Sequence, residues 1–152
     1  MHGEHTAAID VAAGIITRTD GRVLMAERPA GKPWAGYWEF PGGKFESGES
    51  PIVALARELH EELGIELDQA YPWITRVYDY PERRVRLHMY RVLKWHGNPN
   101  GKEGQQISWE NPQAVQCEPL LPANDPILRY LCLPQIYAIT KASKYGVTAF
   151  ME

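Results

Sequence analysis

Apolar and polar residues follow one another along the chain in short segments that predict a mixture of strands and helices. Residues 7–17 are rich in small and β-branched apolar side chains and predict a buried strand. Residues 22–27, after a Thr-Asp-Gly turn, predict the returning strand of a hairpin. Further strands are expected at 37–40, 73–80, 85–95 and 107–109, with Pro41-Gly42-Gly43 ending the first of these.

The clearest helix begins after Ser50. Ser50 is a suitable N-cap, Pro51 suits the first helical position, and Gly64 suits a left-handed C-cap. An apolar stripe recurs at helical spacing and comprises Ile52, Leu55, Ala56, Leu59 and Leu63. A last helix is expected from Asn124 or Asp125, either of which can cap it, through Leu133. Strands mixed with two helices predict an α+β fold or an α/β/α sandwich.

Composition narrows the class of protein. A chain of 152 residues with 44% hydrophobic and 23% charged residues is typical of one globular domain. The net charge of -3 argues against a nucleic-acid polymer as partner. Neither a signal-like N-terminus nor an apolar run long enough to cross a bilayer is present, so we expect a cytoplasmic protein without membrane contact. Cys117 and Cys132 lack zinc-ligand spacing and read as reduced thiols.

Three glutamates on the second half of the first helix carry the candidate chemistry. Glu58, Glu61 and Glu62 span an arc of about 100° beside the apolar stripe. Such like charges repel one another, and a bound hard cation such as Mg²⁺ or Mn²⁺ would offset the repulsion. A solvated acidic face with one Arg57–Glu61 ion pair is the alternative interpretation. The glycine-rich loop before the helix favours a ligand site, because its backbone can approach a ligand closely.

The segment from Gly43 to Ile65 resembles the Nudix box, GX5EX7REUXEEXGU, at every defined position. The resemblance implies a Nudix-type α/β/α sandwich with a mixed sheet and hydrolysis of a nucleoside diphosphate linked to another group. It also implies roles for individual residues. The metal ligands are then Glu58, Glu61, Glu62 and the carbonyl of Gly42, while Arg57 orients the glutamates and Gly43, Glu49 and Gly64 shape the box.

Catalysis in such a site needs a carboxylate that removes a proton from the attacking water. Glu58 is the first candidate for this base and Glu103 the second. The sequence alone does not separate a base from a metal ligand, because both roles need a carboxylate beside the same water.

Much of residues 8–133 is similar to the MutT subgroup, which converts 8-oxo-dGTP to the monophosphate and pyrophosphate. The similarity implies that Glu103 is a further metal ligand or base and that Asn124 reads the base. Oxidation at C8 turns guanine N7 into an N–H donor, and an amide can accept from it while donating to O6. Asn124 as a simple helix cap and Glu103 as an exposed turn residue are the alternatives. Further candidates in the substrate pocket are Arg28, Phe40, Lys44 and Arg83.

The expected activity is therefore Mg²⁺-dependent hydrolysis of 8-oxo-dGTP, which would cleanse the nucleotide pool and avoid mutation. A nucleotide sugar, a dinucleoside polyphosphate and an ordinary dNTP remain alternative substrates, and a non-catalytic ligand-binding module is a third hypothesis. We expect a monomer, with oligomerisation left open. The Nudix domain is expected over residues 1–133. Residues 134–152 are interpreted either as a C-terminal extension or as the start of a second domain. Within them Ile136 to Thr140 predicts a strand and resembles the opening strand of thiamine phosphate synthase.

Overall fold

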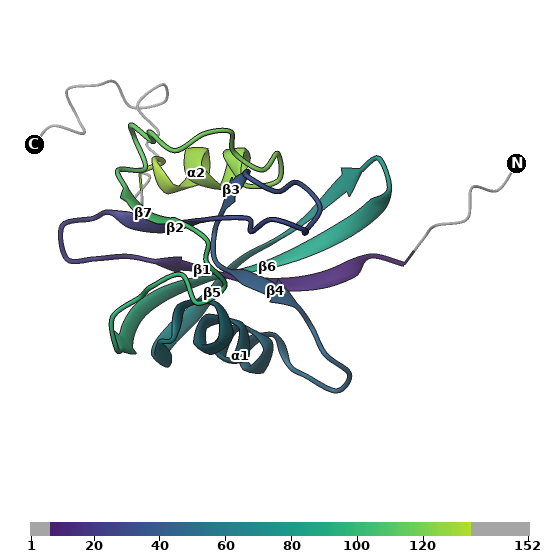
Figure 1. Ribbon diagram of the computed structural model, residues 1–152, viewed down its shortest axis with the longest axis horizontal. Coiled ribbons are helices and arrows are strands. Elements are labelled where there is room, and N and C mark those ends of the chain that lie inside the picture. The colour runs from purple at the N-terminus through teal and green to yellow at the C-terminus, as the bar shows by residue number, and fades with distance from the viewer. Residues whose placement is uncertain (1–6, 135–152) are drawn as a thin grey trace, which may run out of the picture.

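The computed structural model describes residues 7–134, and the strand expected at 136–140 lies outside this range. The described part contains seven strands and two helices in the order β1 (Ile9–Ile16), β2 (Val23–Glu27), β3 (Trp38–Glu39), β4 (Gly42–Lys44), α1 (Pro51–Leu63), β5 (Glu66–Tyr80), β6 (Arg83–His96), β7 (Ile107–Glu110) and α2 (Asp125–Leu131). The helices lie on opposite sides of the strands, as the sandwich expectation requires (Figure 1).

The strands form two sheets. The larger sheet has the order β4-β1-β6-β5, in which β1 pairs parallel with β6 and the other pairs are antiparallel. The smaller sheet has the order β3-β2-β7 and is antiparallel. The predicted hairpin is confirmed at its turn, where Thr17 and Val23 form an antiparallel bridge and the Arg18 amide donates to the Arg22 carbonyl at 2.9 Å. Beyond this turn β1 and β2 separate into different sheets, which the sequence did not predict.

Strand β1 contributes side chains to both faces of the larger sheet. Ala12 and Ile16 join the core beneath α1, whereas Ala13 and Ile15 join the core shared with the smaller sheet and α2. Gly14 lies on the α1 side, where an added Cβ would come within 3.3 Å of Leu55 Cδ1. The missing side chain thus lets α1 pack closely on the sheet that carries the candidate site.

Helix α1 confirms most of its predicted pattern. Leu55, Leu59 and Leu63 are fully buried, and Gly64 closes the helix in the left-handed conformation at φ 67°. Ile52 departs from the expectation, since it is 37% exposed and lies off the buried stripe. Ser50 precedes the helix in an extended conformation but makes no side-chain capping bond.

The boundaries of three other elements differ from the prediction. Strand β5 begins at Glu66 rather than residue 73. Register shifts near Leu67 and Pro72 interrupt the alternation of buried and exposed side chains, so the first part of the strand lacks the sequence pattern of a strand. Helix α2 ends at Leu131 instead of Leu133, consistent with the restriction that Pro134 places on the preceding residue. The glycine pair after Pro41 forms β4 instead of ending a strand.

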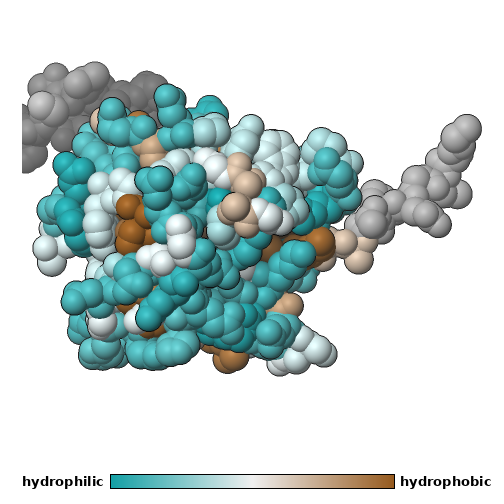
Figure 2. Space-filling model, in the orientation of Figure 1, coloured by the Kyte–Doolittle hydropathy of each residue, from teal (hydrophilic) through white to brown (hydrophobic). Residues whose placement is uncertain are grey.

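The visible surface is mainly hydrophilic, with hydrophobic side chains in small, separate patches (Figure 2). Among residues 7–134 no helix has both the length and the apolar character needed to cross a membrane.

Candidate active site

A cavity of about 390 Å³ opens between β1, β4, α1, the β2–β3 loop and the β5–β6 hairpin. Nine of the residues predicted from sequence line it: Arg28, Phe40, Gly42, Gly43, Lys44, Glu58, Glu62, Arg83 and Asn124. A wider groove of about 860 Å³ between β5, β6 and α2 contains none of the predicted residues. The smaller cavity is therefore the candidate active site.

Five predicted residues lie outside the cavity lining. Gly64 and Glu49 have the structural positions that the sequence pattern assigns to them, at the helix end and in the loop before α1. Glu61 is 55% exposed at the side chain, compared with 15% for Glu58 and Glu62. Arg57 and Glu103 stand beside the cavity and contact residues that line it or approach it.

Arg57 organises the acidic flank of α1. Its Nε and Nη2 donate to the two carboxylate oxygens of Glu49 at 2.7 and 2.9 Å, and Nη1 donates to Glu58 Oε1 at 2.8 Å. Nη2 also donates to the carbonyl oxygen of Lys44 at 3.0 Å, which ties the loop to the helix. The Arg57 hydrogen bond holds the pKa of Glu49 at about 2, with help from the Glu46 amide.

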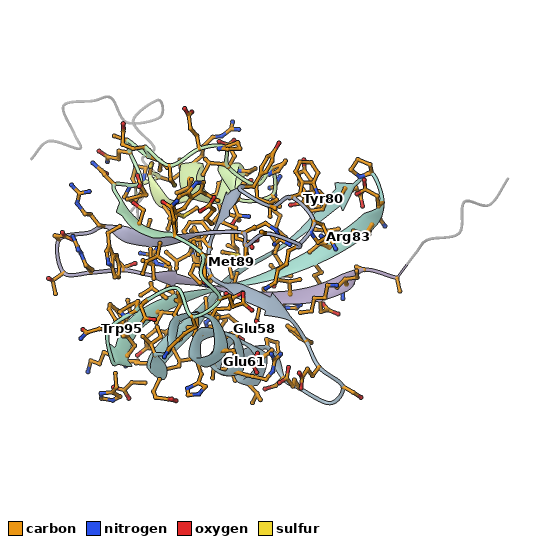
Figure 3. The ribbon with its side chains drawn as sticks, viewed as in Figure 1. Glu58, Glu61, Tyr80, Arg83, Met89 and Trp95 are labelled. Carbon is orange, nitrogen blue, oxygen red and sulfur yellow. The ribbon has the colours of Figure 1, made fainter. Side chains whose placement is uncertain are left out.

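Glu58 lies against the backbone of β4. A Cβ added at Gly43 would stand 2.2 Å from the Glu58 carboxyl carbon, so only glycine leaves room for this carboxylate. Gly42 makes a second close approach, because its own added Cβ would lie 2.0 Å from the Ala12 carbonyl oxygen. The two glycines therefore create the cradle in which the α1 carboxylate meets the backbone (Figure 3 labels Glu58 and Glu61).

Glu62 occupies a different electrostatic environment. Burial, together with the neighbouring carboxylates of Glu39 and Glu58, raises the pKa of Glu62 to about 8. The amide of Gly42 donates to Glu62 Oε2 at 3.3 Å, and the ammonium of Lys32 stands 4.0 Å from Oε1. Too little positive charge surrounds the Glu62 carboxylate to stabilise its ionised form, and a bound cation would supply that charge.

The sequence patterns missed Glu39 and Lys32. Glu39 lines the cavity and accepts a hydrogen bond from Arg28 Nη1 at 2.6 Å, while burial raises its pKa against the effect of that arginine. The sequence does contain one indication of Glu39, because it is a charged residue between Trp38 and Phe40 in an otherwise apolar strand. Lys32 had no such signal, because its role depends on where the loop places it.

The cavity lining also includes a buried amide. Asn124 is 4% exposed, and its Oδ1 accepts a hydrogen bond from the backbone N–H of Phe40 at 3.0 Å. Asn124 occupies the expected N-cap position of α2, but its side chain makes no capping bond to the helix. Arg83 packs over the Tyr80 ring at 5.9 Å, and both lie at the tip of the β5–β6 hairpin (Figure 3).

Comparison with known proteins identifies the family. A NUDIX domain model matches residues 8–131. This chain belongs to the Nudix hydrolase family.

Relatives of this Nudix hydrolase include two enzymes of Escherichia coli (strain K12). The CTP pyrophosphohydrolase is 42% identical over 79% of this chain and 88% of the relative. The 8-oxo-dGTP diphosphatase is 36% identical over 81% of this chain and 95% of the relative. The MutT NUDIX hydrolase from Burkholderia pseudomallei has a TM-score of 0.75 at 27% identity, covering 82% of this chain and 98% of that structure. The expected α+β sandwich and MutT-like membership are therefore confirmed.

In the present side-chain positions, no group of three or more His, Cys, Asp or Glu residues within 7–134 is arranged to hold a metal ion. Several of these carboxylates pair instead with protein cations. Arg57 pairs with Glu58 and Glu61, and Lys32 pairs with Glu103. Hydrogen bonds to these cations turn the carboxylates towards protein partners. The donor chemistry nonetheless suits a hard cation, because carboxylate oxygens meet an open backbone cradle at Gly42 and Gly43.

Proposed function

We propose that this Nudix hydrolase is a divalent-cation-dependent nucleoside triphosphate pyrophosphohydrolase that converts 8-oxo-dGTP to 8-oxo-dGMP and pyrophosphate. The observation that carries the proposal is the fixed amide of Asn124. The Phe40 N–H requires an acceptor, so it identifies which end of the amide is oxygen. The amide nitrogen is then left to donate to a ligand in the cavity.

This amide orientation suits an oxidised guanine. Oδ1 has a second lone pair that can accept from the N7–H of 8-oxoguanine, while Nδ2 donates to O6. Unmodified guanine presents acceptors at both N7 and O6, so its N7 would face the Oδ1 oxygen with no proton between the two acceptors. An unpaired buried polar group costs about 1–3 kcal/mol, which corresponds to roughly ten- to hundredfold discrimination.

The metal proposed for this site is Mg²⁺ or Mn²⁺. Glu58, Glu62 and the carbonyl of Gly42 would hold it in the cradle, with Glu61 and Glu103 joining from its edge. When bound, the ion neutralises phosphate oxygens and makes a water molecule more acidic. Glu58 is the first candidate to accept the proton of that water and Glu103 the second, while Arg57 holds the Glu58 carboxylate in position.

The remaining cavity residues have roles in holding the nucleotide. The basic side chains of Arg28, Lys44 and Arg83 line the cavity and can contact phosphate or base edges. Phe40 offers an apolar wall for the base or sugar, although its side chain is almost completely buried. The substrate is thus a small nucleotide, and the biological role would be to cleanse the nucleotide pool before replication.

The second candidate substrate is CTP, which the name of the 42% identical relative suggests. Glu39 offers physical support for it. Its carboxylate lies in the cavity, and a carboxylate accepts well from the amino group at cytosine N4. The same acceptor can serve the ring N–H and amino group of guanine, so Glu39 alone does not choose between the two substrates.

Initial rates of pyrophosphate release with 8-oxo-dGTP, dGTP and CTP test the proposal. We expect kcat/KM for 8-oxo-dGTP to exceed that for dGTP by at least about tenfold. Asn124→Asp keeps an oxygen for the Phe40 amide and replaces the donor amino group with a second acceptor. The lost donor to O6 serves both guanine nucleotides, while the retained oxygen still faces N7, so we expect kcat/KM to fall about tenfold or more for 8-oxo-dGTP and for dGTP with the preference for 8-oxo-dGTP retained.

Two results would contradict the substrate assignment. One is a preference of the unmodified enzyme for CTP or dGTP. The other is an Asn124→Asp variant that folds normally and hydrolyses both guanine nucleotides with the kcat/KM of the unmodified enzyme. Absence of hydrolysis with all three nucleotides would instead leave this chain as an enzyme for another nucleoside diphosphate derivative.

A further inference from the structure

Lys32 stands among the carboxylates at the mouth of the candidate active site. Its Nζ donates to Glu103 Oε2 at 2.9 Å and lies 4.0 Å from Glu62 Oε1. The charge of Glu58 also acts on this ammonium group. One lysine thereby partly neutralises acidic groups from two separate segments, helix α1 and the loop before β7.

The β2–β3 loop places Lys32 at this point by contacts on either side of it. The Lys32 amide donates to the Pro29 carbonyl at 3.3 Å, and Arg28 Nε donates to the Pro33 carbonyl at 2.7 Å. Trp34 packs against the rings of Tyr37 and Tyr80 with centroids 5.0 and 5.7 Å away. These contacts fix the conformation of the β2–β3 loop, and that conformation brings the ammonium group of Lys32 close to the carboxylates.

The Lys32 side chain keeps freedom to move while the loop stays in place. It is 43% exposed, and its charge sits at the end of a flexible four-carbon stem. Lys32 also lines the cavity that would receive the nucleotide. A divalent cation held by Glu62 and Glu103 would repel the ammonium group, whereas the phosphates arriving with that cation would attract it.

We propose that Lys32 changes partners when the enzyme is loaded. In the metal-free enzyme the ammonium group is the counter-ion of Glu62 and Glu103, and in the loaded enzyme it binds phosphate oxygens of the substrate. This inference rests on the proposed function and adds to it a residue that couples metal binding to phosphate binding. Lys32 acts in substrate binding and takes no part in proton transfer.

Lys32→Met tests the proposal because it keeps the length of the stem and removes only the charge. Without nucleotide, we expect the Kd for Mn²⁺, measured by calorimetry, to fall about three- to tenfold, since a competing cation has gone. For 8-oxo-dGTP or another hydrolysed nucleoside triphosphate we expect KM to rise about five- to tenfold, since a phosphate contact has gone. The value of kcat should stay within about twofold.

Two further variants act as controls. Lys94→Met removes the same charge from an exposed position on β6 that does not line the cavity, and it should change neither the Mn²⁺ affinity nor KM. Lys32→Arg retains a cation and should keep both values within about threefold of the unmodified enzyme. A thermal unfolding curve verifies that each variant is folded before its binding is measured.

Tighter Mn²⁺ binding together with a higher KM supports the proposal, because loss of a merely structural lysine would weaken both metal binding and substrate binding. Unchanged or weaker Mn²⁺ binding by Lys32→Met, including no binding by either protein, overturns the counter-ion role. An unchanged KM overturns the phosphate role. If the unmodified enzyme hydrolyses no nucleoside triphosphate, the proposed function fails on that result alone, while the Mn²⁺ titration still decides the counter-ion role.

Discussion

On one flank of α1 the carboxylates of Glu49, Glu58 and Glu61 gather around the guanidinium of Arg57, with Glu49 bound through both oxygens. On the other flank burial, together with the charges of Glu39 and Glu58, raises the pKa of Glu62 to about 8. The half-exposed ammonium of Lys32, at 4.0 Å, and the amide of Gly42 partly offset these effects. The carboxylates of the first flank are hydrogen-bonded to a guanidinium, whereas Glu62 has no such direct bond to a cation.

This difference separates two tasks within one helix. The Arg57 flank makes its own ion pairs and thereby fixes the loop and the position of Glu58 without help from a ligand. On the Glu62 flank neighbouring carboxylates repel one another, and a bound cation would reduce that repulsion. Removing a residue from the first flank should therefore damage the enzyme in every state, whereas the second flank should behave differently with and without metal.

The largest effect is expected from breaking the first flank with Arg57→Met. Glu58 then loses the hydrogen bond that positions it, and a displacement of about 1 Å in a catalytic group reduces kcat roughly a hundredfold. The free energy of unfolding should fall by about 1–2 kcal/mol, because charge-assisted bonds at a partly exposed site are screened by solvent. Steady-state kinetics and urea denaturation measure the two effects.

Arg129→Met is the matched control for this prediction. Arg129 pairs with Asp125 along α2, but its side chain is 74% exposed and far less enclosed than Arg57. Its loss should change the free energy of unfolding by less than about 0.5 kcal/mol and leave kcat unchanged. Equal effects of the two substitutions would mean that Arg57 is an ordinary surface ion pair.

A smaller effect, confined to a pH window, is expected on the second flank. The folded protein raises the pKa of Glu62 from its ordinary 4.5 to about 8, so it binds a proton that the unfolded chain has released. Stability in the absence of metal should therefore fall as pH rises from about 4.5 to 8. Glu62→Gln should remove roughly 1–3 kcal/mol of that decline, measured by denaturation at pH 5, 6.5 and 8.

The pH prediction has a control on the opposite flank. Arg57 holds the pKa of Glu49 at about 2, so the stabilisation from Glu49 is lost only as pH falls from about 4.5 through 2. Glu49→Gln should thus lower stability by the same amount at pH 5 and pH 8. Saturating Mg²⁺ should flatten the profile of the unmodified protein and leave that of Glu62→Gln unchanged. A Glu62→Gln profile as steep as the original would contradict the assignment.

Sequence reasoning found the first flank more completely than the second, for a physical reason. Arg57, Glu58 and Glu61 are neighbours along one helix, so their spacing alone predicts their contacts. Glu39 and Lys32 reach the site from β3 and the preceding loop, and only the tertiary fold brings them to Glu62. The same limit applies to the fold. The α1 pattern was visible, but the bulges of β5 and the separation of β1 from β2 depend on non-local pairing.

The smallest effect should come from Glu61, which the sequence grouped with Glu58 and Glu62. Its side chain is 55% exposed, and its contact with Arg57 Nη1 is 3.4 Å long. Glu61→Gln should therefore change the free energy of unfolding without metal by less than about 0.5 kcal/mol at any pH between 5 and 8. Mn²⁺ affinity in the presence of nucleotide should still fall, because the proposed site recruits this carboxylate from its edge. A variant with unchanged Mn²⁺ affinity would remove Glu61 from the proposed ligands and leave the cation to Glu58, Glu62, Glu103 and the backbone.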